Sequence, residues 1–268
     1  MKINFKTLGI AATMVTGFVL AGGVTPSFAE EEGGGSKKEA NYDTKAILTF
    51  KPGDGKDDIT KPVDPTDPGK IDPVEPVDPT EPDGKPKPGT PGPLSIDYAS
   101  GLDFGEQKIT STNQVYKAKA QKFGKREKPE GPNYVQVTDN RGTETGWSLQ
   151  VKQNGQFKSE SGKELEGAEI TFKNAWVNTA SASKKPSIFK ESFTLKTDGT
   201  GVAENIMSAK AGEGAGTYVL AFGDDATGGE SIELSVPGKT TKYAEKYSTS
   251  LTWTLTDTPG QGGVTEPE

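Results

Sequence analysis

Short runs in which apolar and polar residues alternate recur from residue 94 to residue 256, and they constrain the fold more than any other feature of the chain. Successive side chains of a β-strand point to opposite faces of its sheet, so such a run predicts a strand with one buried face. Glycine, Asn and Asp separate the runs, and the pair Asn154-Gly155 predicts a hairpin turn. The main runs are Gln114–Ala120, Tyr134–Thr138, Thr145–Val151, Ala168–Val177, Phe193–Leu195, Gly216–Phe222, Ser231–Val236 and Ser248–Thr256.

These runs predict an all-β fold, a β-sandwich over residues 94–268. A segment of this length is large enough to bury one sizeable core. The helical signal is weak, and Glu204–Ala209 is the only stretch in which we expect a short helix, placed in a loop.

Residues 51–93 differ sharply in composition, because proline recurs about every third position in units such as V-D-P and D-P-T. Proline fixes φ and lacks an amide donor, which disfavours both helix and central strand. We therefore predict an extended polyproline II spacer that is lengthened by its acidic side chains. The alternative, a ligand for a proline-recognising domain, is less favoured because such domains are chiefly intracellular.

A strand candidate at Tyr42–Phe50 precedes this proline-rich tract. A single strand is not stable alone. We therefore predict that residues 42–50 join the sheet of the downstream domain, and that the proline-rich tract is a loop excursion from that domain. The even-numbered positions of this segment are mainly apolar, namely Tyr42, Thr44, Ala46, Leu48 and Phe50. The odd-numbered positions include the polar Lys45 and Thr49, and Ile47 is the exception among them.

The N-terminus has the pattern of a secretory signal. Lys2 and Lys6 precede an apolar run over residues 8–24, and Ser27-Phe28-Ala29 fits a cleavage site. We predict a signal peptide over residues 1–29 and a disordered, glycine-rich leader over residues 30–41. No later segment approaches the length of a membrane span, so we expect a secreted protein that does not span the membrane after cleavage.

The composition argues against most enzyme chemistry. The chain has no His and no Cys, which excludes Ser-His-Asp and Cys-His catalysis and most zinc sites. A net charge of −7 disfavours nucleic acid as a partner. We expect no enzymatic activity, catalytic residue, cofactor or metal. Three pairs of acids are close enough in sequence to be considered for glycoside hydrolysis or calcium, although none lies in a recognisable motif: Asp97 with Asp103, Glu164 with Glu166, and Asp224 with Asp225.

Two Trp-x-Leu triplets stand out among the strands. Trp147-Ser148-Leu149 is the first, and the second lies in Y-x-x-x-L-x-W-x-L-x-x-x-P, which runs from Tyr247 to Pro259 and contains Leu251, Trp253 and Leu255. Residues two apart in a strand share a face, so each triplet presents a Trp and a Leu together. In one interpretation these side chains fill the core. In the other they form a platform on which sugar rings stack, and the spacing leaves both open.

The paired triplets, together with an export signal, resemble the WxL domain of surface proteins from low-GC Gram-positive bacteria. The resemblance covers residues 42–268 and also includes the opening pattern LSIDYAS followed by Leu102-Asp103-Phe104-Gly105. It implies a protein attached non-covalently to peptidoglycan at the cell surface. We expect no covalent sorting, because the C-terminus has no L-P-x-T-G-like motif. The alternative that it implies is an assembly component or adhesin that docks onto a wall- or membrane-anchored partner protein or a host extracellular matrix protein.

Overall fold

The computed structural model describes residues 41–53, 59–70, 72–195 and 203–258. The chain divides into two units, residues 1–48 and 49–268. The predicted signal peptide and nearly all of the predicted leader lie outside the described residues. In the first unit, the described residues 41–48 contain no strand or helix, and their side chains are exposed.

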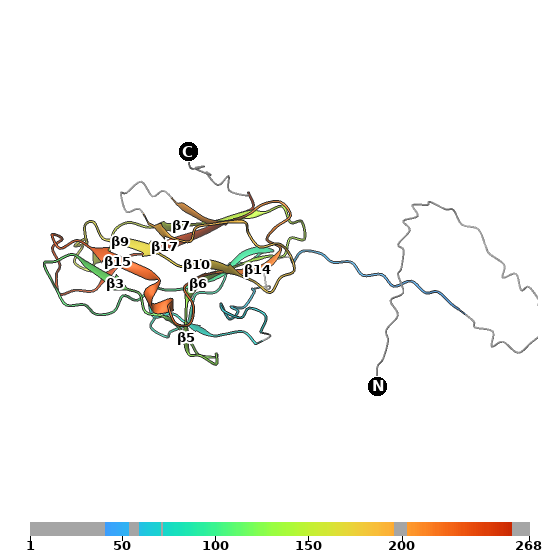
Figure 1. Ribbon diagram of the computed structural model, residues 1–268, viewed down its shortest axis with the longest axis horizontal. Helices are drawn as coiled ribbons and strands as arrows, with labels where there is room; N and C mark the ends of the chain where they lie inside the picture. Colours follow the sequence, from blue (N-terminus) through green and yellow to red (C-terminus); the bar gives the residue numbers. More distant parts are fainter. Residues whose placement is uncertain (1–40, 54–58, 71, 196–202, 259–268) are drawn as a thin grey trace, which may run out of the picture. The chain divides into compact units, whose positions relative to one another are not determined.

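The second unit is built from antiparallel strands with one 3-10 turn, η1 (Gly228–Glu230), in its described part (Figure 1). Three sheets have four strands each. Their orders are β10 (Ala175–Asn178), β14 (Gly216–Phe222), β6 (Asn133–Asp139), β2 (Leu94–Ala99); β11 (Ile188–Phe189), β13 (Glu204–Ala209), β7 (Trp147–Gln153), β17 (Leu251–Thr256); and β12 (Phe193–Thr194), β9 (Glu169–Phe172), β15 (Ile232–Val236), β3 (Gln114–Lys117).

Two smaller sheets complete the second unit. One joins β1 (Pro76–Val77), β4 (Gln121–Phe123) and β5 (Glu130–Gly131), and the other joins β16 (Tyr247–Ser248) to β8 (Lys158–Ser159). The predicted all-β class is confirmed. The strands are divided among five sheets, so the two-layer sandwich stays a prediction.

A main core and a second apolar cluster hold these sheets. Strand β14 separates the two clusters, because its successive side chains point to opposite faces of the sheet. Tyr218, Leu220 and Phe222 belong to the main core, whereas Val219 and Ala221 belong to the second cluster. Every residue of the neighbouring strand β6 is buried, including its polar side chains. A strand buried on both faces needs a cover on each side, and the outer cover of β6 includes the proline-rich tract.

The described part of the proline-rich tract is folded against the domain and is not a solvated spacer. Val74 is buried in the second cluster, and β1 pairs with β4. The Val63 amide donates to Gln136 Oε1 at 2.8 Å, so the tract also satisfies a polar side chain of β6. This corrects the spacer predicted over residues 51–93 for its described part, residues 59–70 and 72–93. The physical reason is that proline removes only its own amide donor, which leaves the carbonyls and the other amides free to bond.

Two local predictions were also wrong. Glu204–Ala209 is a strand, β13, because it lies between β7 and β11 and its last four residues are buried. Asn154-Gly155 does not join two paired strands, since β7 pairs with β13 and β17 and not with the strand that follows it. The Asn154 side chain instead donates to Ser250 Oγ and Thr252 Oγ1.

The predicted strand at Tyr42–Phe50 is not formed in this structure. Residues 41–50 have no assigned strand, and four apolar side chains are strongly exposed, namely Tyr42 (91%), Ile47 (93%), Leu48 (77%) and Phe50 (85%). The pairing of this segment with the domain therefore stays a prediction.

A buried ion pair fastens the proline-rich tract. Arg126, 4% exposed in its side chain, donates from Nε to Asp64 Oδ2 at 2.9 Å and from Nη2 to Asp225 Oδ1 at 2.6 Å. Asp64 is itself 3% exposed. Burial acts to raise the pKa of Asp64, but hydrogen bonds from Arg126 and Thr66 outweigh it and hold the pKa below its ordinary value.

We predict that Arg126→Met lowers the free energy of unfolding by about 3–5 kcal/mol, because the buried Asp64 carboxylate loses its close cationic partner and keeps only Lys70 at 3.9 Å. Urea denaturation measures the change. Lys128→Met is the matched control, since Lys128 pairs with the same Asp225 while 67% exposed, and it should cost less than about 1 kcal/mol. Equal, small losses in both variants would mean that the tract is not held by this pair.

We also predict an acid-dependent loss of stability that depends on Asp64. Because its pKa is lower in the folded chain, the stabilisation is complete above the ordinary value of 3.8 and is lost as pH falls through the folded-state pKa. Asp64→Asn should remove this part of the pH dependence in urea titrations between neutral and acidic pH. An Asp64→Asn profile parallel to that of the wild type would contradict the assignment.

Candidate functional site

The first Trp-x-Leu triplet lies in the core. Trp147 and Leu149 on β7 are both 0% exposed, and Trp147 Nε1 donates to the Gly214 carbonyl at 3.0 Å. The backbone packs closely there, because a Cβ added to Gly214 would lie 2.6 Å from Trp147 Nε1. The Trp147 ring therefore has no surface on which a sugar could stack.

The second triplet is adjacent in the same sheet but only partly buried. On β17, Trp253 lies opposite Val151 and Leu255 opposite Leu149, so the two triplets form one apolar face. Leu251, Trp253 and Leu255 are half-buried, and Thr252 and Thr254 between them are exposed. The difference arises because β7 has a neighbour on each side, whereas β17 is the last strand of its sheet. Tyr247 of this motif is half-buried on β16, and Pro259 lies outside the described residues.

A groove of about 1370 Å³ opens beside β17, and we call it the apolar groove. Residues of β2, β3 and β17 line it, and each of these is the last strand of a four-stranded sheet. The last strand of each large sheet therefore borders the same space. Core side chains form part of its wall, namely Phe157, Leu165, Ile170, Leu234 and Val236, together with the half-buried Phe104, Tyr116, Leu251 and Trp253.

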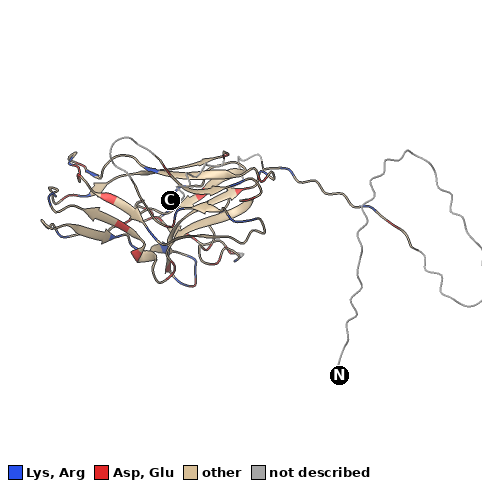
Figure 2. Ribbon diagram, turned by 45° about the horizontal axis from the view of Figure 1, so that its top comes forward, with Lys and Arg blue, Asp and Glu red and all other residues tan. Residues whose placement is uncertain are grey.

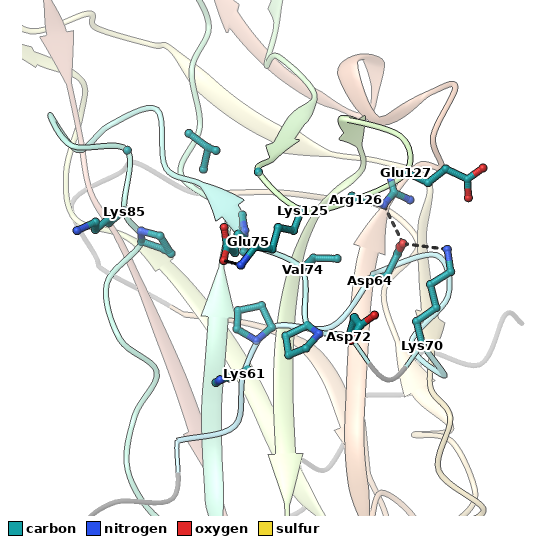
Figure 3. Close-up of a pocket in the computed structure, with 17 residues that line it drawn as sticks. Lys61, Asp64, Lys70, Asp72, Val74, Glu75, Lys85, Lys125, Arg126 and Glu127 are labelled. Atoms are coloured by element: carbon teal, nitrogen blue, oxygen red, sulfur yellow. Dashed lines mark hydrogen bonds and ion pairs between the residues drawn. The ribbon is translucent and has the colours of Figure 1, made fainter.

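A second hollow of about 990 Å³, which we call the charged cleft, lies between the proline-rich tract and the β4–β5 loop (Figure 3). Two ion pairs tie its walls together, Arg126 with Asp64 and Lys125 with Glu75, and Lys70 of the tract also approaches Asp64. Other charges that line it form no ion pair within the described residues, namely Lys61, Lys85, Asp72 and Glu127. The charged cleft therefore presents unpaired groups of both signs to solvent.

Most of the acids considered in pairs from the sequence form hydrogen bonds or ion pairs with nearby residues. Asp97 is buried and accepts from Ser95, Gln136 and Thr138, and its burial raises its pKa despite these bonds. Asp103 pairs with Lys119.

Three of the remaining four acids follow the same pattern, and Asp225 pairs with Arg126 and Lys128. Glu164 pairs with Lys158, and Asp224 accepts from the Thr227 hydroxyl and amide at the start of η1. Charges of both signs are interspersed along the second unit (Figure 2). Within the described residues, no three His, Cys, Asp or Glu side chains gather as a metal site would require.

The family of this chain follows from a match of its sequence to a known domain. A family model described as "WxL domain surface cell wall-binding" matches residues 37–259. The chain belongs to the WxL family. The match spans the segment at Tyr42, the proline-rich tract and both Trp-x-Leu triplets. The protein therefore contains a surface domain of the cell wall-binding type. No curated protein and no solved structure matches the chain. The part of the WxL chain described here contains no helix long and apolar enough to cross a membrane.

The sequence analysis did not predict the charged cleft, although a repeated motif indicates that the proline-rich tract is folded. The unit V-D-P-T occurs twice, at residues 63–66 and 77–80. In each copy the Asp is buried and its Oδ1 accepts from the amide of the Thr two residues on, at 3.0 Å for Asp64 and 2.8 Å for Asp78. Asp-initiated turns of this kind fold a chain locally, so the repeats indicate structure as well as extension.

The two tryptophans should differ when truncated. We predict that Trp147→Ala lowers the free energy of unfolding by about 3–5 kcal/mol, because it empties a fully buried site, and that Trp253→Ala costs distinctly less. Urea denaturation of both variants measures the difference. A loss for Trp253→Ala as large as that for Trp147→Ala would show that β17 is as deeply packed as β7.

Proposed function

We propose that this protein is secreted after cleavage of residues 1–29, and that its WxL domain attaches it non-covalently to the peptidoglycan of a Gram-positive wall. The observation that carries the proposal is the match of residues 37–259 to a surface, wall-binding domain. Binding rather than catalysis is the role that this family description supports.

Peptidoglycan suits the charges of the molecule better than anionic secondary polymers do. The formal net charge is −7, and repulsion between like charges opposes association with an anionic polymer. Peptidoglycan stem peptides carry both carboxylates and amines. Lys61 and Lys85 could receive the carboxylates and Asp72 and Glu127 the amines, so we propose the charged cleft as the contact surface.

Co-sedimentation of residues 30–268 with Gram-positive sacculi tests the proposal. We expect binding that persists after the secondary polymers are stripped from the sacculi, because peptidoglycan is the proposed ligand. Binding that disappears on stripping would assign the ligand to those polymers. Absence of binding to either preparation would mean that the surface location depends on a partner protein.

Variants of the charged cleft locate the contact. We predict that Lys61→Gln combined with Lys85→Gln weakens sedimentation with stripped sacculi about threefold to tenfold, since exposed charge pairs contribute roughly 0.2–1 kcal/mol each. Lys239→Gln is the matched control, because Lys239 is exposed and lies outside the charged cleft. An equal effect of the control would show that the loss reflects net charge and not this surface.

A second candidate function is protein docking, as in an assembly component or adhesin. The apolar groove favours it, because a partly apolar wall bordered by three end strands suits an extended peptide. If the protein has this docking function, its partners would be wall-anchored proteins or host matrix proteins.

A further inference from the structure

We propose that the turn Asp78-Pro79-Thr80 is a receptor for an arginine side chain of a partner protein, and that the neighbouring apolar residues of that partner lie in the apolar groove. The proposal rests on protein docking, the second candidate function above, and it names the group that the partner must supply. It does not depend on wall attachment, because peptidoglycan stem peptides carry amines and not guanidinium groups.

The proline-rich tract contains two copies of one folded unit. Residues 62–68 read P-V-D-P-T-D-P, and residues 76–82 read P-V-D-P-T-E-P. In each copy, Oδ1 of the aspartate (Asp64 or Asp78) accepts from both the amide and the hydroxyl of the threonine two positions on. The amide of the residue three positions on donates to the carbonyl of the same aspartate. The two copies therefore have the same local fold.

The first copy already holds an arginine at two points. Arg126 Nε donates to Asp64 Oδ2 at 2.9 Å, and Arg126 Nη2 donates to Thr66 Oγ1 at 2.6 Å. A guanidinium group is planar and presents its donors in a fixed fork, which fits two acceptors held in this way. Lys70 adds a second cation, 3.9 Å from Asp64 Oδ2. The turn therefore offers the acceptors that a guanidinium group requires.

The second copy has the same acceptors without a cation. Asp78 is 8% exposed, and among the described residues no Lys or Arg side chain forms an ion pair with it. Gly84 stands where the first copy has Lys70, and Lys87 pairs with Glu81. A carboxylate that is nearly buried is unfavourable without a cationic partner. Asp78 therefore favours a cation supplied by another molecule.

The turn of the second copy opens on the apolar groove. Asp78 and Thr80 both line it. The backbone at Gly101 passes directly against the turn, since a Cβ added there would lie 2.3 Å from Asp78 Oδ1. Leu102 and Phe104, which follow, are half-buried and line the same groove. A charge receptor beside apolar walls suits a protein segment in which an arginine is followed by apolar side chains.

Two matched substitutions test whether Asp78 has a cationic partner in the free protein. Asparagine keeps the oxygen that accepts from the threonine, but it removes the charge. We expect Asp78→Asn to leave the midpoint of urea denaturation unchanged or to raise it, whereas Asp64→Asn should lower it. A comparable loss in Asp78→Asn would overturn the proposal, because a cation of this chain would then already pair with Asp78.

Binding is measured with the probe acetyl-Leu-Arg-Leu-amide on ¹⁵N-labelled residues 30–268, through the NMR shifts of the Thr80, Glu81 and Gly101 amides. The control peptide has citrulline in place of arginine, because citrulline is uncharged and has nearly the same shape. We expect saturable shifts with the arginine peptide and about tenfold weaker binding of the citrulline peptide, since a charged hydrogen bond is lost. Equal binding of the two peptides, or no shift with either, would overturn the proposal.

Asp83→Asn is the matched control variant, because Asp83 is exposed in the same tract and lines neither hollow. It should bind the arginine peptide as the wild type does, whereas Asp78→Asn should bind it about tenfold more weakly. Equal losses in the two variants would overturn the proposal, because net charge would then explain the binding.

Co-sedimentation with stripped sacculi separates this proposal from wall attachment. Asp78→Asn should sediment as the wild type does, since the proposed occupant is a protein. A loss of sedimentation in parallel with the loss of peptide binding would overturn the proposal, because the turn would then serve the wall. The peptide measurement needs no wall material, so a failure of wall attachment leaves its result intact.

Discussion

The burial of β6 on both faces is the constraint on which the rest of the second unit depends. One face packs Val135 and Val137 into the main core, and the other presents Tyr134, Gln136 and Thr138. A buried polar face is unfavourable unless its groups are hydrogen-bonded. The proline-rich tract supplies part of that bonding through Val63 and Lys61, and the buried Asp97 accepts from Gln136 and Thr138. The tract is therefore an integral layer of the domain.

The sequence predicted the strands well where local alternation and burial agree. Gly216–Phe222 is an example, since the predicted run and β14 coincide. The prediction failed where neighbouring strands, and not the local sequence pattern, determine the secondary structure. Glu204–Ala209 has little strand pattern, yet two neighbouring strands fix it as β13. The triplets show the same limit for the site, because Trp147 and Trp253 have equivalent local patterns and differ only in how many strands flank them.

The prediction that the proline-rich tract is an extended spacer was wrong for a different physical reason. Regular proline does prevent helix and central strand, and this part of the expectation agrees with the single two-residue strand β1 in the described tract. It does not prevent packing, because a polyproline backbone keeps its carbonyls and its apolar rings. The charged cleft follows from this, since one of its walls is the tract itself. Sequence could have indicated it only through the repeated Asp-Pro-Thr turns.

The fastening of the tract by Arg126 determines how much of the tract's length lies along the domain. As a free polyproline II chain, residues 51–93 would extend about 130 Å. The described residues 59–70 and 72–93 instead pack against the domain, so their length is taken up within the fold. The length of a proline-rich tract is therefore no measure of its reach when acidic turns and an ion pair fold it back on its own domain.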